Sequence, residues 1–153
     1  MRYIEALKNL DLEPNSISTF LAGGITDCPD WQQEMVKLLR GTDLTLLNPR
    51  RVNFPMADPT AASQQIDWEH HHLRLADAIS FWFCAEAMQP ITLYELGAWS
   101  MTDKPLFVGI HPEYSRRQDV EIQTKLVRPD VKIVYTLSAL ANQIKQFSTQ
   151  EKI

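Results

Sequence analysis

The 153-residue sequence has no long apolar run of the kind that a membrane span or a secretory signal requires. The first eight residues carry an acid, Glu5, and no uninterrupted apolar segment. No stretch approaches the roughly 18 apolar residues of a membrane helix. Cysteine is also scarce, because Cys28 and Cys84 are the only two and lack a metal-type spacing. We therefore expect reduced thiols and a cytoplasmic protein.

Basic residues are too few for a polyanionic partner. Lysine and arginine total 15 against 19 aspartates and glutamates, which gives a formal charge of −4. A nucleic acid or an anionic membrane would require clustered positive charge, so a small-molecule ligand is the more natural expectation. The composition, 44% hydrophobic and 22% charged, is that of an ordinary globular protein, and the length suits one domain covering residues 1–153.

Glycine is rare, yet two of the five glycines are adjacent at Gly23-Gly24, where they end a β-prone run that follows a polar lead-in at Pro14-Asn15. Apolar patterning predicts strands over residues 16–22, 44–47, 78–84, 106–110 and 131–135. It predicts helices over residues 31–40, 61–76, 96–102, 120–126 and 138–147.

Strands that alternate with helices indicate an α/β fold with a parallel sheet and right-handed crossovers. We expect a flavodoxin-like, Rossmann-type three-layer sandwich with strand order 2-1-3-4-5, whose switch point lies between the first and third strands. Gly23-Gly24 follows the first strand and the loop before Glu95 follows the third. Both should therefore border one ligand crevice.

Glu95 stands near the start of a helix that follows the apolar strand at 78–84. A carboxylate there is well placed to act as a nucleophile or to hold a ligand. Thr92 and Glu95 also fit a capping box, in which the two side chains satisfy each other's backbone amides. This segment alone favours the structural role.

The predicted helix at 61–76 contains Asp67, Glu69 and three consecutive histidines at 70–72. Adjacent helical side chains diverge by about 100°, so the histidines do not converge on one metal ion. Asp67 and Glu69 also face different directions, so at most one should point into the crevice. Arg50 and Arg51 suit a bidentate phosphate contact, although solvated surface arginines are commoner.

A further pattern joins four segments: Phe20–Ile25, Trp68-Glu69 with Leu73 and Ala76-Asp77, Phe81–Phe83, and Tyr94–Ala98. In this order they resemble the nucleoside 2-deoxyribosyltransferase-like family, over about Ser18 to Ile110. The resemblance implies that Glu95 is the nucleophile and that an acid one helix earlier, Glu69 or secondly Asp67, assists departure of the base. It also implies a homo-oligomer in which a neighbouring subunit completes the site.

The chain departs from the family's pattern at two places. Nucleotide-hydrolysing relatives carry serine and arginine after the first strand, where this chain has residues 25–28. Transferase relatives have an aspartate shortly before the nucleophile, where this chain has Gln89-Pro90. The base, the sugar, the 5′ substituent and the acceptor therefore stay open.

The sequence thus predicts an enzyme that cleaves or transfers at the N-glycosidic bond of a nucleoside or nucleotide through a glycosyl-Glu95 ester. The predicted substrate contacts are Gly23, Gly24, Ile25, Gln89 and Tyr94. This chemistry requires no metal or organic cofactor. The alternatives are a sensor of the same fold that binds without turnover, and a pure interaction module.

Overall fold

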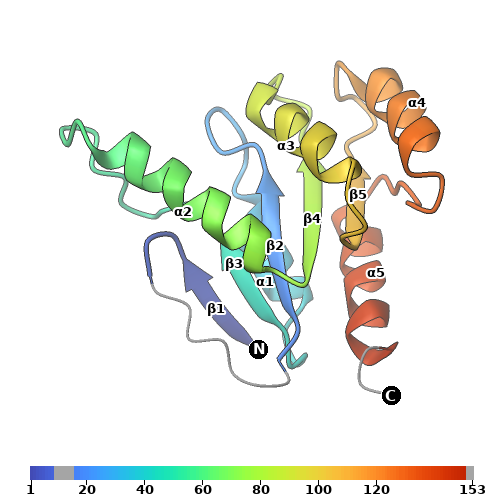
Figure 1. Ribbon diagram of the computed structural model, residues 1–153, viewed down its shortest axis with the longest axis horizontal. Helices are drawn as coiled ribbons and strands as arrows, with labels where there is room; N and C mark the ends of the chain where they lie inside the picture. The colour runs from blue at the N-terminus through green and yellow to red at the C-terminus, as the bar shows by residue number, and fades with distance from the viewer. Residues whose placement is uncertain (9–15, 151–153) are drawn as a thin grey trace.

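The computed structural model describes residues 1–8 and 16–150, so the predicted lead-in at Pro14-Asn15 lies outside the described part (Figure 1). Its strands are β1 (Arg2–Glu5), β2 (Ser18–Gly23), β3 (Thr45–Asn48), β4 (Ala78–Phe83) and β5 (Leu106–Ile110). They form one parallel sheet in the order β1-β3-β2-β4-β5. The predicted flavodoxin-like α/β class is confirmed, with its switch point between β2 and β4.

The two edges of the sheet differ from the prediction. β1 pairs with β3, and its short apolar centre between Arg2 and Glu5 gave too weak a signal in the sequence. At the other edge, the segment predicted as a strand at 131–135 makes a single bridge between Val134 and Gly109. Val134 donates to the carbonyl of Val108 (3.0 Å) and accepts from the amide of Ile110 (2.9 Å). The prediction of a full fifth strand there is wrong.

Five helices cover the two faces of the sheet (Figure 1). They are α1 (Trp31–Leu38), α2 (Ala61–Leu75), α3 (Pro90–Ser100), α4 (Arg117–Val127) and α5 (Leu137–Gln150). α2, α3 and α4 pack on one face, and α1 and α5 on the other. No described helix is long and apolar enough to cross a membrane.

Side chains along the central strands alternate between the two helical layers, as the period of a strand requires. Phe20 of β2 and Phe81 of β4 pack under α2 and α3. Leu21 and Trp82 point the other way, toward α1 and α5. Both faces are apolar, which explains the nearly continuous hydrophobic run in β4.

The start of α3 contradicts the capping-box interpretation. The helix begins at Pro90, whose fixed φ and missing N–H suit a first helical position. Gln89 precedes it in the left-handed region (φ 55°, ψ 57°), and Thr92 is a buried third residue rather than a cap. Glu95 consequently lies in the second turn, where its carboxyl has no capping role.

The expectation of two free thiols is also wrong, because the structure pairs Cys28 with Cys84 as a disulfide, with the two Cα atoms 6.5 Å apart. The loop after β2 folds back and carries Cys28 to the end of β4. This proximity arises from the fold of the loop, which the spacing of 56 residues does not reveal. The bond joins two segments that border the crevice.

Candidate active site

A cavity of about 470 Å³ opens where β2 and β4 end. It is lined by Phe20, residues 22–27, Pro49, Glu69, residues 87–91 and Glu95. Since the strands are parallel, the loops after β2, β3 and β4 meet at one edge of the sheet, and α2 and α3 supply the remaining wall. Ligands of open α/β sheets bind at this position.

Two carboxyl groups from different helices face this cavity. Glu95 of α3 is largely buried, and its pKa rises to about 8, first because burial disfavours the charged form and second because Glu69 is close. Burial also raises the pKa of Glu69, against the opposing effect of a hydrogen bond from Gln65. The two groups therefore titrate as a coupled pair that holds a proton near neutral pH.

The amide of Gln65 fixes the carboxylate of Glu69. Its Nε2 donates to Glu69 Oε1 and to the carbonyl of Pro49, each at 2.7 Å. Gln65 and Glu69 are four residues apart on α2 and so lie on the same face of the helix. Sequence reasoning missed Gln65, although its spacing from a candidate acid was a usable signal.

Gly23 and Gly24 line the cavity, but their lack of a side chain serves the protein's own packing. A Cβ on Gly23 would collide with the ring of Trp31 and the carbonyl of Trp82. A Cβ on Gly24 would collide with the sulfur of Cys28 and the side chain of Gln89. The glycines thus let the walls of the cavity pack closely against one another, which is a reason for glycine apart from the substrate contacts predicted at these positions.

Gln89 ties the loop after β2 to the loop after β4. Its side chain is buried, and its Oε1 accepts from the amide of Gly24 at 2.9 Å. Its Nε2 donates to the carbonyls of Cys84 (2.9 Å) and Ala87 (3.1 Å). Both donor positions and one acceptor position of the amide are therefore used within the protein. The geometry therefore gives Gln89 a structural role in holding the two loops. Gln89 also lines the cavity, where the sequence predicts a substrate contact.

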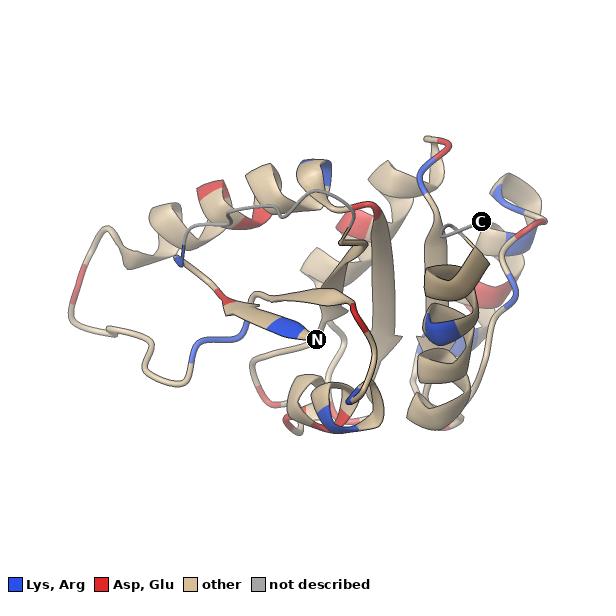
Figure 2. Ribbon diagram, turned by 90° about the horizontal axis from the view of Figure 1, so that it is seen from below, with Lys and Arg blue, Asp and Glu red and all other residues tan. Residues whose placement is uncertain are grey.

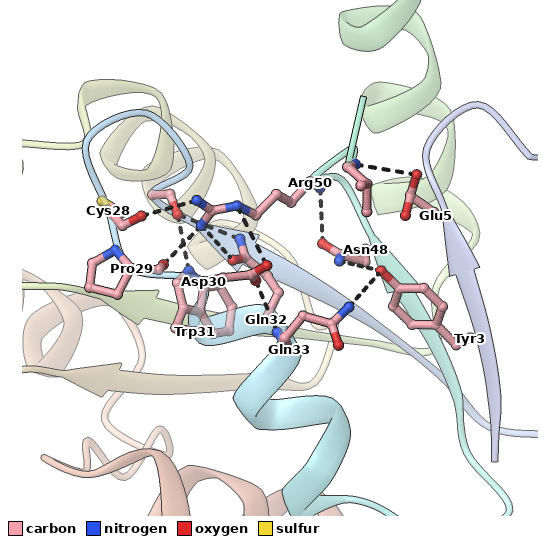
Figure 3. A network of polar contacts seen from close by, with 12 residues as sticks. Tyr3, Glu5, Cys28, Pro29, Asp30, Trp31, Gln32, Gln33, Asn48 and Arg50 are labelled. Atoms are coloured by element: carbon pink, nitrogen blue, oxygen red, sulfur yellow. Dashed lines mark hydrogen bonds and ion pairs between the residues drawn. The ribbon is translucent and has the colours of Figure 1, made fainter. Parts of the chain in front are cut away.

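Arg50 holds the loop after β2 rather than an open phosphate site (Figure 3). Its guanidinium donates to the carbonyls of Cys28 (3.0 Å) and Pro29 (2.8 Å) and to Gln32 Oε1 (3.3 Å). Its backbone amide donates to Asn48 Oδ1 at 2.9 Å. With these donors committed, Arg50 stabilises the loop after β2.

Arg51 lies outside the carboxylate cavity. It lines a neighbouring cavity of about 360 Å³ and places its guanidinium carbon 5.3 Å from the centre of the Phe54 ring. The two cavities share Ile25, so the substrate-contact position predicted there lies on the wall between them.

Two predicted site residues lie away from the cavity. Asp67 is exposed on α2 and does not line it, so the geometry distinguishes Glu69 from Asp67 where the sequence left both open. Tyr94 is 76% exposed and also lies outside the lining. Tyr94 and Glu95 are consecutive on α3, and one residue step turns the helix by about 100°, which is why these neighbours face different surroundings.

The histidines of α2 point in different directions. His72 is buried, stacks on Trp68 with ring centres 4.0 Å apart, and places Nδ1 2.7 Å from the Trp68 carbonyl oxygen. Burial lowers the pKa of His72. His70 and His71 are exposed. Within residues 1–8 and 16–150, no group of three metal-ligating side chains could hold an ion.

Another cavity of about 460 Å³ lies between β5 and α5. Its polar lining is mostly amides from α5, and its charged residues are Asp130 and Lys132. Asp130 forms an ion pair with Arg128, with 2.7 Å between Oδ2 and Nη2. Asp130 is the one carboxyl group among the described residues that line this cavity, so it has no facing carboxyl pair.

The fold and the cavity together define a flavodoxin-like α/β protein with two partly buried carboxyl groups in the cavity at its switch point. A sequence model of nucleoside 2-deoxyribosyltransferase-like proteins matches residues 16–114, and the chain belongs to that family. The match covers β2 to β5 and includes both carboxyl groups. The family relates the chain to nucleoside deoxyribosyltransferases and hence, at a coarse level, to glycosyl transfer. A search of curated proteins found no significant match.

Proposed function

We propose that the protein cleaves or transfers at the N-glycosidic bond of a nucleoside or nucleotide, with Glu95 as the nucleophile. The observation that carries the proposal is the coupling of Glu95 and Glu69 inside one cavity at the switch point. Two carboxyl groups with separated roles are what a retaining glycosidic displacement requires. Family membership supports the same class of reaction.

The two carboxyl groups take different roles in this reaction. Glu95 attacks C1′ and forms a glycosyl ester, while the bond to the base breaks toward the base nitrogen. Glu69 gives its proton to that nitrogen and later removes a proton from the attacking water or accepting base. Gln65 keeps Glu69 oriented during both steps. The single proton of the pair is then on Glu69 when the bond breaks, since positive charge developing at C1′ favours ionised Glu95.

The proton that the pair holds also favours a second candidate function. A protonated Glu95 is a poor nucleophile, so a cavity in which it stays protonated would bind a nucleoside without turnover. Such a sensor would keep ligand-induced thermal stabilisation and lack product formation.

A nucleoside and nucleotide panel, incubated with and without acceptor bases, separates these candidates. Chromatography should reveal a free base, and a new nucleoside where an acceptor is present. Glu95→Gln should abolish both products and retain thermal stabilisation by the ligand. Stabilisation without product in the parent protein would favour the sensor instead.

We further propose that a second copy of the chain covers the outer face of α3. This face is uncharged and exposed, with Ile91, Tyr94 and Met101 at 65%, 76% and 78% exposure. It continues into the cavity mouth, because Ile91 also lines the cavity. A two-fold contact places the same face of both copies together, and an uncharged face meets its copy without charge repulsion.

Sedimentation velocity should therefore find an oligomer that Tyr94→Arg dissociates. The control is Ile122→Arg, which introduces the same charge at a half-exposed position of α4. A monomeric parent protein, or equal dissociation by both variants, would contradict the assignment of this face.

A further inference from the structure

The carboxylate cavity carries acidic groups and no basic ones among the described residues that line it. Asp27 lies at its exposed rim, and Glu69 and Glu95 lie inside. No lysine, arginine or histidine of the described ranges belongs to the lining. Figure 2 shows the acidic positions in the middle of α2 and the position of its arginine in the last turn. The charges of the cavity are thus unfavourable for an anionic ligand.

The two arginines that follow β3, Arg50 and Arg51, do not line this cavity. The guanidinium of Arg50 donates to the carbonyls of Cys28 and Pro29, and both Arg50 and Arg51 line the adjacent cavity. Both therefore lie behind the wall that contains Ile25. Coulomb interactions are strong in a partly buried site, so a positive charge on a ligand gains from all three acids.

In the absence of a ligand, Glu95 retains a proton at neutral pH. Burial and the neighbouring Glu69 raise the pKa of Glu95 to about 8, so a proton neutralises part of the pair at pH 7. A cationic ligand would take over that role and lower the pKa of Glu95. By linkage, its binding should release a proton, which a neutral ligand of the same shape should not do.

We propose that this cavity selects N-glycosides whose leaving group is cationic, namely nucleosides with a quaternary heteroaromatic nitrogen at C1′. The inference rests on the proposed function. In such a substrate the C1′–N bond breaks with its electron pair moving to the nitrogen, whose charge is thereby neutralised. The Glu95 carboxylate bonds to C1′, so a cation and an anion become a neutral base and a neutral ester. Water then attacks C1′, its proton leaves to Glu69, and the Glu95 carboxylate is restored.

Cleavage of the cationic substrate needs no acid, whereas cleavage of a neutral nucleoside does. A neutral base leaves well only when Glu69 supplies a proton, whereas a quaternary base leaves without one. The matched probes are nicotinamide riboside, with a fixed positive charge, and its uncharged dihydro form. Their carbocyclic analogues, in which a methylene replaces the ring oxygen, have a stable C1′–N bond and serve for binding.

Calorimetry at pH 7 in two buffers of different ionisation enthalpy should find the cationic analogue bound at least about tenfold tighter, with proton release. Glu69→Gln should reduce this preference, whereas Asp67→Asn, the same loss of charge on the exposed face of α2, should preserve it. In a first turnover, Glu69→Gln should slow base release from the neutral probe at least about 100-fold more than from the cationic one.

The outcomes separate this inference from the proposed function. Equal or weaker binding of the cation, or an equal effect of Glu69→Gln on both probes, overturns the selection of cationic leaving groups. If the neutral probe is cleaved through Glu95 and preferred, the proposed function stands and this inference falls. Tighter cation binding with proton release but no cleavage of any nucleoside supports the charge selection and overturns the glycosidic chemistry. Failure of both analogues to bind overturns both.

Discussion

Raising the pH should destabilise the folded protein through Glu95. The pKa of this carboxyl rises from an ordinary 4.5 to about 8 on folding. Below pH 4.5 the folded and unfolded chains both carry the proton. Between pH 4.5 and 8 the unfolded chain releases it and the folded chain retains it, so the free energy of unfolding falls. At about 1.4 kcal/mol per pH unit, the full loss approaches about 5 kcal/mol, an upper value because water entering the cavity weakens the effect.

Glu95→Gln isolates this contribution, because the amide resembles the protonated carboxyl and does not titrate. Urea unfolding, followed by tryptophan fluorescence at pH 5, 7 and 9, should give the two proteins similar stability at pH 5. The variant should become more stable than the parent by about 3–5 kcal/mol at pH 9. The exposed Glu113→Gln serves as the control and should follow the parent. Identical pH dependence of parent and Glu95→Gln would refute the burial and coupling of Glu95.

The remaining predictions concern the surroundings of the pair. Glu69→Gln should lower turnover of a neutral nucleoside by about 10²–10⁴-fold, as measured by chromatography of the released base. Asp67→Asn should leave turnover unchanged, and equal effects of the two variants would contradict the distinction between the two acids. Gln89→Ala breaks one hydrogen bond between the loops after β2 and β4 and two within the loop after β4. It should cost about 1–3 kcal/mol of unfolding free energy in a urea titration, so an unchanged midpoint would contradict its structural role. Elemental analysis of the purified protein should find no stoichiometric transition metal, and a metal bound at residues 70–72 would contradict the site assignment.

The sequence predicted those parts of the fold that rest on repeated local signals. The apolar runs of β2 and β4 and the glycines after β2 located the switch point, because a parallel sheet brings the ends of these strands together. The start of α3 was misplaced because Thr92 and Glu95 satisfy a capping pattern. Pro90, two residues earlier, is an equally good first helical residue and is the one used.

Other features depended on contacts that no local pattern specifies. The pairing of Cys28 with Cys84 follows from the path of the loop after β2. The orientation of Glu69 into the cavity, with Asp67 facing solvent, depends on how α2 is rotated on the sheet. The family resemblance ranked Glu69 before Asp67, but no local pattern specified this rotation. Arg50 suits a phosphate contact by residue type, but in the fold its guanidinium donates to the carbonyls of Cys28 and Pro29.

The most direct test of the central claim is to trap the glycosyl ester on Glu95. A nucleoside with fluorine at C2′ and a reactive leaving group forms the ester faster than water removes it, because fluorine destabilises the oxocarbenium-like transition state of both steps. Intact-mass and peptide mass spectrometry should find one fluoroglycosyl unit per chain, located on Glu95, in the parent and in Asp67→Asn, and none in Glu95→Gln. Turnover of the parent without an adduct, or an adduct on another residue, would contradict the proposal that Glu95 is the nucleophile.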